Sequence, residues 1–155
     1  MAIRVSASRQ LPVPAEQAWA ALTDWETQGR WMPATRISAE GAGVGTRLRA
    51  ATGLGPLRVV DTMVVTEWEP PRRCVVRHTG RILRGYGIFT VEPVDADSCR
   101  VAWVEEFTVP SIVDRRPLTV VPGRLAQPFF GYALGRFERI GLRPGRASGG
   151  GAATR

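Results

Sequence analysis

A carboxylate lies among aromatic residues near the end of an apolar, strand-like segment, where Glu105 alternates with Trp103 and Phe107. This spacing predicts that all three side chains share one face of a strand. Apolar surroundings disfavour the ionised form of a carboxyl group unless a cation pairs with it. We expect Glu105 to orient a ligand by a hydrogen bond or to act as a general acid. The structural alternative is an ion pair with Arg77 or Arg100.

His78 is the only histidine, and it alternates with Cys74 and Val76. It is a candidate proton shuttle because an imidazole titrates near neutral pH; the alternative is a hydrogen-bonded packing residue. One histidine excludes a multi-histidine metal site, and no other ligand cluster appears, so we expect neither a metal nor a cofactor. Asp61 interrupts an apolar strand on the face of Met63. It is either paired with arginine or a polar group of a pocket.

The other candidates are mostly aromatic. Trp31 lies at a helix-to-strand corner, where it could border the entrance of a cavity, and two tyrosines could present hydroxyl groups to a ligand. The catalytic candidates are Glu105 and His78. The full set of ligand-binding candidates is Trp31, Asp61, Met63, His78, Tyr86, Trp103, Glu105, Phe107, Phe129 and Tyr132. No Ser-His-Asp order, GxSxG motif or glycine-rich nucleotide loop occurs.

Length and charge limit the possible partners. The 155 residues suit one domain. All 21 basic residues are arginine, and they are spread along the chain rather than clustered, so the net charge of +7 does not predict nucleic-acid binding. No apolar run is long enough to span a membrane, and no leader precedes the first strand, which makes the cytoplasm the expected location. Cys74 and Cys99 show no metal spacing and are expected as free thiols.

The elements that must position these groups form a distinctive order. A strand at 3–11 is followed by two short helices at 14–23 and 24–30, then by a run of strands, and finally by a long helix at 124–142. The strands of the run are expected at 35–40, 46–52, 57–68, 74–79, 83–92 and 100–109. Turn residues separate them without intervening helices, which predicts an antiparallel meander. Residues 144–155 are rich in Gly and Ala and are expected to be a disordered tail.

This order resembles the SRPBCC superfamily, also described as START-like or polyketide cyclase/dehydrase-like. The resemblance rests on VPAEQAWAALTDWETQGRWMP at 13–33, GVGTRLR at 43–49, EWEPPRR at 67–73 and GYGIFTVEPVDADSCRVAWVEEF at 85–107. It implies an α+β helix-grip fold over residues 1–143, in which a curved seven-stranded antiparallel sheet wraps around the C-terminal helix. It also implies an apolar cavity between the two. Members bind lipids, sterols, quinones or polyketides, and some are aromatase/cyclases.

Three functions follow as hypotheses. The first is binding of a small hydrophobic ligand, such as a lipid, an isoprenoid quinone or a polyketide-like aromatic, by a monomer or weak homodimer. The second is a polyketide aromatase/cyclase, which requires at least two polar groups converging in the cavity. The third is a protein-interaction module without a ligand. A purely apolar cavity would exclude the enzyme.

Overall fold

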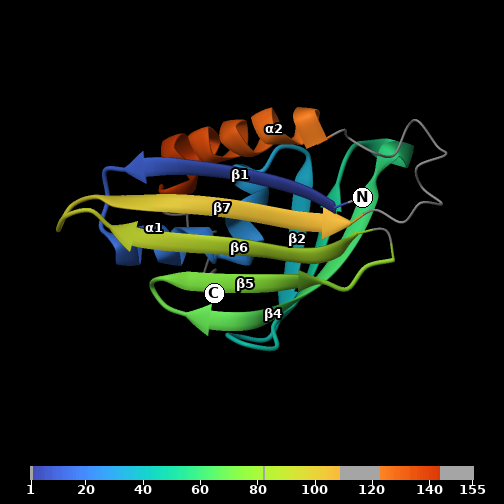
Figure 1. Ribbon diagram of the computed structural model, residues 1–155, viewed down its shortest axis with the longest axis horizontal. Helices are drawn as coiled ribbons and strands as arrows, with labels where there is room; N and C mark the ends of the chain where they lie inside the picture. The colour runs from blue at the N-terminus through green and yellow to red at the C-terminus, as the bar shows by residue number, and fades with distance from the viewer. Residues whose placement is uncertain (1, 82, 109–122, 144–155) are drawn as a thin grey trace, which may run out of the picture.

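The computed structural model describes residues 2–81, 83–108 and 123–143, and it shows a seven-stranded sheet with its helices on one side (Figure 1). The strands are β1 (Ala2–Leu11), β2 (Thr35–Glu40), β3 (Arg47–Thr52), β4 (Val59–Glu69), β5 (Arg73–His78), β6 (Arg84–Pro93) and β7 (Cys99–Thr108). The α-helices are α1 (Ala15–Leu22) and α2 (Gly123–Arg136). Two 3₁₀ helices, η1 (Trp25–Arg30) and η2 (Gly55–Leu57), and a π-helical turn, η3 (Phe137–Gly141), complete the elements.

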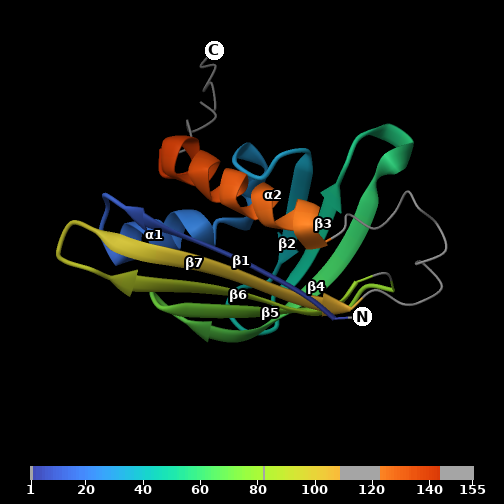
Figure 2. The same cartoon turned by 45° about the horizontal axis from the view of Figure 1, so that its top comes forward.

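The predicted helix-grip architecture is confirmed. The strands are ordered β1-β7-β6-β5-β4-β3-β2, and every neighbouring pair is antiparallel. Each strand pairs with the next in sequence, except that β1 lies at the far edge beside β7. Figure 2 shows the sheet curving around α2. We call the face toward α1 and α2 the inner face and the opposite face the outer face.

The strand boundaries lie within two residues of those predicted. The C-terminal helix differs, because its last turn is π-helical rather than α-helical. Gly141 lies in that turn, where an added Cβ atom would be 2.4 Å from the ring of Phe137. Pro128 lies inside α2. The predicted tail, 144–155, is outside the described residues.

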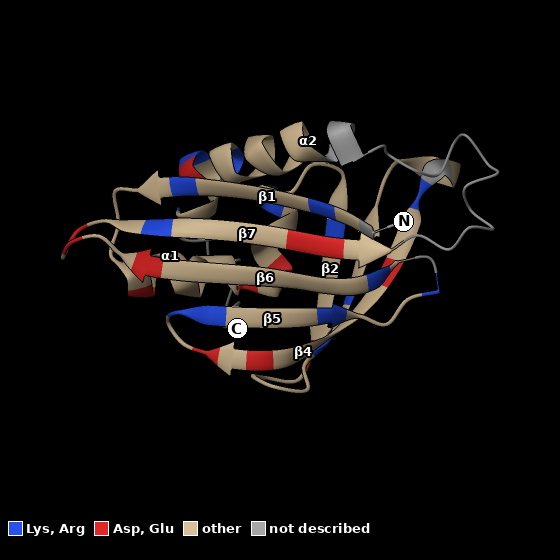
Figure 3. Ribbon diagram, viewed as in Figure 1, with Lys and Arg blue, Asp and Glu red and all other residues tan. Residues whose placement is uncertain are grey.

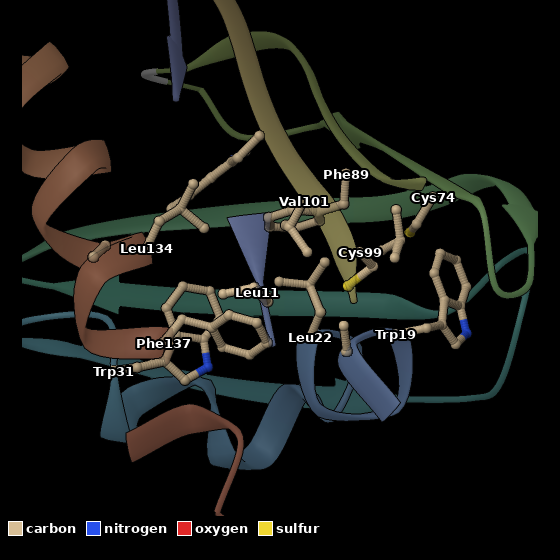
Figure 4. Packing of buried hydrophobic residues seen from close by; sticks show 14 of the residues in the cluster. Leu11, Trp19, Leu22, Trp31, Cys74, Phe89, Cys99, Val101, Leu134 and Phe137 are labelled. Carbon is tan, nitrogen blue, oxygen red and sulfur yellow. The ribbon is translucent and has the colours of Figure 1, made fainter. Parts of the chain in front are cut away.

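The core lies between the inner face and the helices (Figure 4). Leu134 and Phe137 from the C-terminal helical segment are at most 1% exposed. The Phe137 ring packs edge-on against Trp31, with 5.0 Å between centroids. Arg136 donates hydrogen bonds to the carbonyl oxygens of Arg30 and Trp31. These contacts hold the end of α2 against η1 and thus over the inner face.

The two cysteines are buried and free. Cys74 is on β5 and Cys99 is on β7, with β6 between them. Two strand spacings amount to about 9–10 Å, which exceeds the reach of a disulfide. The placement is the one that the predicted meander requires.

Candidate functional site

The three ionisable residues that interrupt the strands meet on the inner face. The ring of His78 on β5 lies between two carboxylates: Nδ1 is 2.6 Å from Oδ2 of Asp61, and Nε2 is 2.9 Å from Oε2 of Glu105. Trp103 donates its indole N–H to Oε1 of Glu105 at 2.7 Å. We call this connected group the Asp61–His78–Glu105 chain. It replaces the alternative pairing of Glu105 with an arginine.

The sheet register explains how residues from separate strands meet. His78 lies opposite Met63 on β4, so Asp61 is two positions away on the same face. Glu105 is on β7, two strands from His78, and its partner on the intervening strand β6 is Gly87. Because Gly87 has no side chain, the Glu105 carboxylate extends across β6 to reach the imidazole.

Two glycines make this geometry possible, and the sequence analysis did not identify either one as part of the site. A Cβ atom at Gly87 would lie 2.5 Å from Oε1 of Glu105. One at Gly80 would lie 2.9 Å from Oδ1 of Asp61. A glycine inside a strand often marks a close approach by another group. That signal was present in the sequence GYGIF around Gly87.

The three side chains of the Asp61–His78–Glu105 chain are almost completely buried. The side chains of His78, Asp61 and Glu105 are 7%, 11% and 10% exposed. Burial by itself lowers the pKa of His78. Its hydrogen bonds to the two carboxyl groups, together with their charges, outweigh this effect, so the pKa rises from 6.5 to about 10. At neutral pH the imidazole is therefore protonated. The site holds an imidazolium between two carboxylates, each accepting one ring N–H.

The only histidine offers a direct test of this charge state. We expect the ¹⁵N and ¹H resonances of the His78 ring to titrate near pH 10 rather than near 6.5. Both ring nitrogens should carry a proton at pH 7, because each faces a carboxylate oxygen. A long-range ¹H–¹⁵N NMR titration measures both properties. A midpoint near 6.5 would show that the carboxylates do not stabilise the cation.

Aromatic side chains surround the Glu105 end of the Asp61–His78–Glu105 chain. The Trp103 ring contacts Phe130 of α2, with 4.2 Å between centroids, and Phe89 of β6, at 5.2 Å. Three buried side-chain polar atoms of the described residues lack a hydrogen-bond partner, and two of them belong to the core beneath α2: Oδ1 of Asp61 and Nε1 of Trp31; the third is Oγ of Ser98. The first accepts a hydrogen bond and the second donates one. A ligand or water on the inner face could donate a hydrogen bond to Oδ1 of Asp61 or accept one from Nε1 of Trp31.

The remaining predicted residues divide between the two faces. Met63 and Phe107 are half-buried, and strand alternation places both on the inner face, where Met63 packs against the core. Phe129 is half-buried beside Phe130 on α2, with 5.7 Å between ring centroids. Their binding roles stay predictions.

Three aromatic placements need correction. Trp31, expected at a cavity entrance, is fully buried and packs on Phe137. Tyr86 is 38% exposed and lies on the outer face, because it is an odd number of positions from Phe89, which points inward. Tyr132 is 54% exposed on α2. Neither tyrosine joins the Asp61–His78–Glu105 chain.

The three residues of the chain do not form a metal site. The carboxylates approach opposite nitrogens of one ring, so their oxygens do not converge on a single point. In the described part of the protein, no group of three or more His, Cys, Asp or Glu side chains is placed to hold a metal ion. Nor does any helix in that part have the length and hydrophobicity needed to cross a bilayer.

Solved structures share this fold. The aromatase/cyclase Zhui from Streptomyces sp. R1128 superposes with a TM-score of 0.67 at 16% identity, covering 92% of each chain. A START superfamily protein from Mycobacterium smegmatis gives 0.65 at 16% identity, covering 88% of this chain and 92% of that one. Norcoclaurine synthase from Thalictrum flavum, in complex with dopamine and hydroxybenzaldehyde, gives 0.60 at 16% identity, covering 89% and 88%.

No curated protein sequence shows significant similarity to this protein. A family model does match it, over residues 2–141, and that family is described as polyketide cyclase/dehydrase and lipid transport. The match includes all three residues of the Asp61–His78–Glu105 chain and the whole sheet. The protein belongs to the polyketide cyclase/dehydrase and lipid transport family.

Proposed function

We propose that the protein binds a small, largely apolar carbonyl compound on the inner face and catalyses proton transfer on it, as a polyketide cyclase would. The Asp61–His78–Glu105 chain carries this proposal. Three buried titratable groups in one hydrogen-bonded row cost free energy to desolvate, and such groups concentrate at functional sites. The convergence of Asp61, His78 and Glu105 on the inner face supports the enzyme hypothesis.

The chemistry follows from the charges. Glu105 accepts the proton from the carbon next to a ligand carbonyl, the C–H electron pair forms the enolate C=C bond, and the carbonyl π electrons move to oxygen. The protonated His78 beside Glu105 stabilises its carboxylate before transfer. Asp61 is a positioning residue, because its hydrogen bond holds the opposite ring nitrogen. The aromatic rings around Trp103 would contact the body of the ligand.

A second candidate function is binding without chemistry, as in lipid transport. The aromatic inner surface favours it, since burial of apolar ligand area stabilises a complex by roughly 25 cal/mol per Å² before ordering costs. Under this alternative the Asp61–His78–Glu105 chain would only orient the ligand. Binding and turnover therefore have to be measured separately.

The test uses a ketone with an aromatic body, 4-phenyl-2-butanone, in D₂O. Quenching of tryptophan fluorescence reports binding, because Trp103 lies on the inner face and Trp31 packs beside it, with 6.1 Å between ring centroids. Mass spectrometry then follows deuterium incorporation next to the carbonyl. We expect the protein to accelerate this exchange, and Glu105→Gln to reduce the acceleration about 100-fold, the usual contribution of a general base.

The neighbouring Glu106 supplies a matched control. It is on the same strand but points to the outer face, where it pairs with Arg4. Glu106→Gln should leave both binding and exchange unchanged. Binding without accelerated exchange would favour the transport function, and equal losses in the two variants would contradict a role for the inner-face carboxylate.

A further inference from the structure

The outer face carries a groove that the proposed function does not use. It has a volume of about 850 Å³ and lies over β4, β5 and β6 and the loop between β5 and β6. Four arginines line it: Arg73, Arg77, Arg81 and Arg84. Figure 3 shows the basic segments at the end of β5, in the following loop and at the start of β6. These arginines all lie within residues 73–84, and the pairing of β5 with β6 places them on one face of the sheet.

Most of this positive charge is not neutralised within the protein. Arg73 pairs with Glu67 at 2.9 Å, at one end of β5. At the other end, no carboxylate of the described residues lies within 4 Å of the guanidinium nitrogens of Arg77, Arg81 or Arg84, all of which are exposed. The groove therefore has a cationic end formed by three arginines.

An apolar surface adjoins the cationic end. Val75 of β5 lies directly opposite Ile88 of β6, and both line the groove. Arg77 lies opposite Tyr86 in the next outward-facing pair. A hydrogen bond to Glu106 raises the pKa of Tyr86, and Tyr86 also lines the groove. Cations and apolar side chains thus alternate along one open depression.

We propose that this groove binds an amphipathic phosphate monoester, with its phosphate among Arg77, Arg81 and Arg84 and its apolar body on Val75, Ile88 and Tyr86. A phosphate monoester carries a charge of about −1.5 to −2 at pH 7 and accepts paired hydrogen bonds from guanidinium groups. Because three arginines here lack acidic partners, a phosphate monoester matches their charge better than a ligand with a single carboxylate would. The volume is in the range of small-molecule sites, about 300–1,000 Å³.

The experiment measures binding of 2-naphthyl phosphate by isothermal titration calorimetry and by ¹⁵N chemical shifts of β5 and β6. We expect 2-naphthyl phosphate to bind at least tenfold more tightly than either 2-naphthol or inorganic phosphate, since it engages both parts of the groove. The double variant Arg77→Gln/Arg84→Gln should weaken binding at least tenfold. Both side chains are exposed, so the fold should persist, and unchanged ¹⁵N shifts elsewhere would verify it.

A charge-matched control is the double variant Arg47→Gln/Arg49→Gln on β3, whose side chains are exposed on the same outer face but do not line the groove. It should bind as tightly as the unmodified protein. Equal weakening in the two double variants would overturn the proposal, because it would show attraction by net charge alone. Tight binding of hexaglutamate without binding of naphthyl phosphate would overturn it in favour of an acidic protein partner.

The groove and the inner-face site share His78, but neither Glu105 nor Asp61 lines the groove. Glu105→Gln, which removes the proposed base, should leave binding of 2-naphthyl phosphate unchanged. Loss of ketone exchange with intact phosphate binding, or the reverse, therefore separates a failure of one proposal from a failure of the other.

Discussion

Replacing His78 with glutamine is expected to lower the free energy of unfolding at pH 7 by about 3–5 kcal/mol, the cost of removing one partner from a buried ionic group. The substitution leaves Asp61 and Glu105 buried without the cation that lies between them. Glutamine restores part of the hydrogen bonding but none of the charge. Urea unfolding followed by tryptophan fluorescence measures the difference.

The pH dependence of that difference identifies its cause. His78 has a raised pKa in the folded protein, so its contribution to stability is fully present below pH 6.5 and is lost as the pH rises toward about 10. The difference in unfolding free energy between the unmodified protein and His78→Gln should therefore be largest near pH 6 and should decrease steadily at higher pH. Groups outside the Asp61–His78–Glu105 chain titrate alike in both proteins and largely cancel in the comparison.

A triple variant separates charge from packing. Asp61→Asn, His78→Gln and Glu105→Gln together remove the cation and both carboxylates while keeping similar shapes. It should unfold less readily than His78→Gln alone, because no unpaired buried charge remains. If the triple variant is no more stable than the single one, the loss comes from packing, and the electrostatic account of the chain is wrong.

Local patterning was enough to predict the antiparallel run of strands and the shared face of the central residues, whereas the helix-grip arrangement came from the resemblance to the SRPBCC superfamily. The alternation of Trp103, Glu105 and Phe107 assigned one face of β7, and the same period placed His78 with Cys74 and Val76 on β5. Turn residues separated the strands and so predicted their antiparallel order. These signals act over a few residues, where side-chain direction is fixed by the strand itself.

Side-chain contacts between different strands could not be predicted from patterns within one strand. The meeting of Glu105 with His78 depends on the pairing register and on the missing side chain of Gly87 between them. The same limit applies to the arginines of the outer groove, which are adjacent only after β5 and β6 pair. The placement of Tyr86 differs in kind, because only its expected inner-face position was wrong and its role in ligand binding stays a prediction. Its position relative to Phe89 already indicated the outer face, and strand periodicity alone would have corrected it.

Replacing Gly87 with alanine is expected to displace the Glu105 carboxylate from His78. The added Cβ atom would lie 2.5 Å from Oε1, 2.9 Å from Cδ and 3.0 Å from Oε2 of Glu105, and the end of that side chain moves more easily than the strand backbone. His78 would then keep only Asp61 as a partner. We expect the midpoint of its NMR titration to fall from about 10 toward 6.5, by at least one pH unit, with a stability loss of about 1–3 kcal/mol for a charged hydrogen bond.

This loss would run against the intrinsic effect of the substitution, because alanine suits an extended strand better than glycine does. Gly131→Ala is the matched control: it lies on α2, where an added Cβ atom meets nothing within 4 Å, and it should leave the His78 titration unchanged. Gly87→Ala should also reduce ketone exchange as Glu105→Gln does, although it alters no ionisable group. If the His78 midpoint stays near 10 in Gly87→Ala, the carboxylate reaches the imidazole without needing the gap in β6, and the glycine has no part in assembling the site.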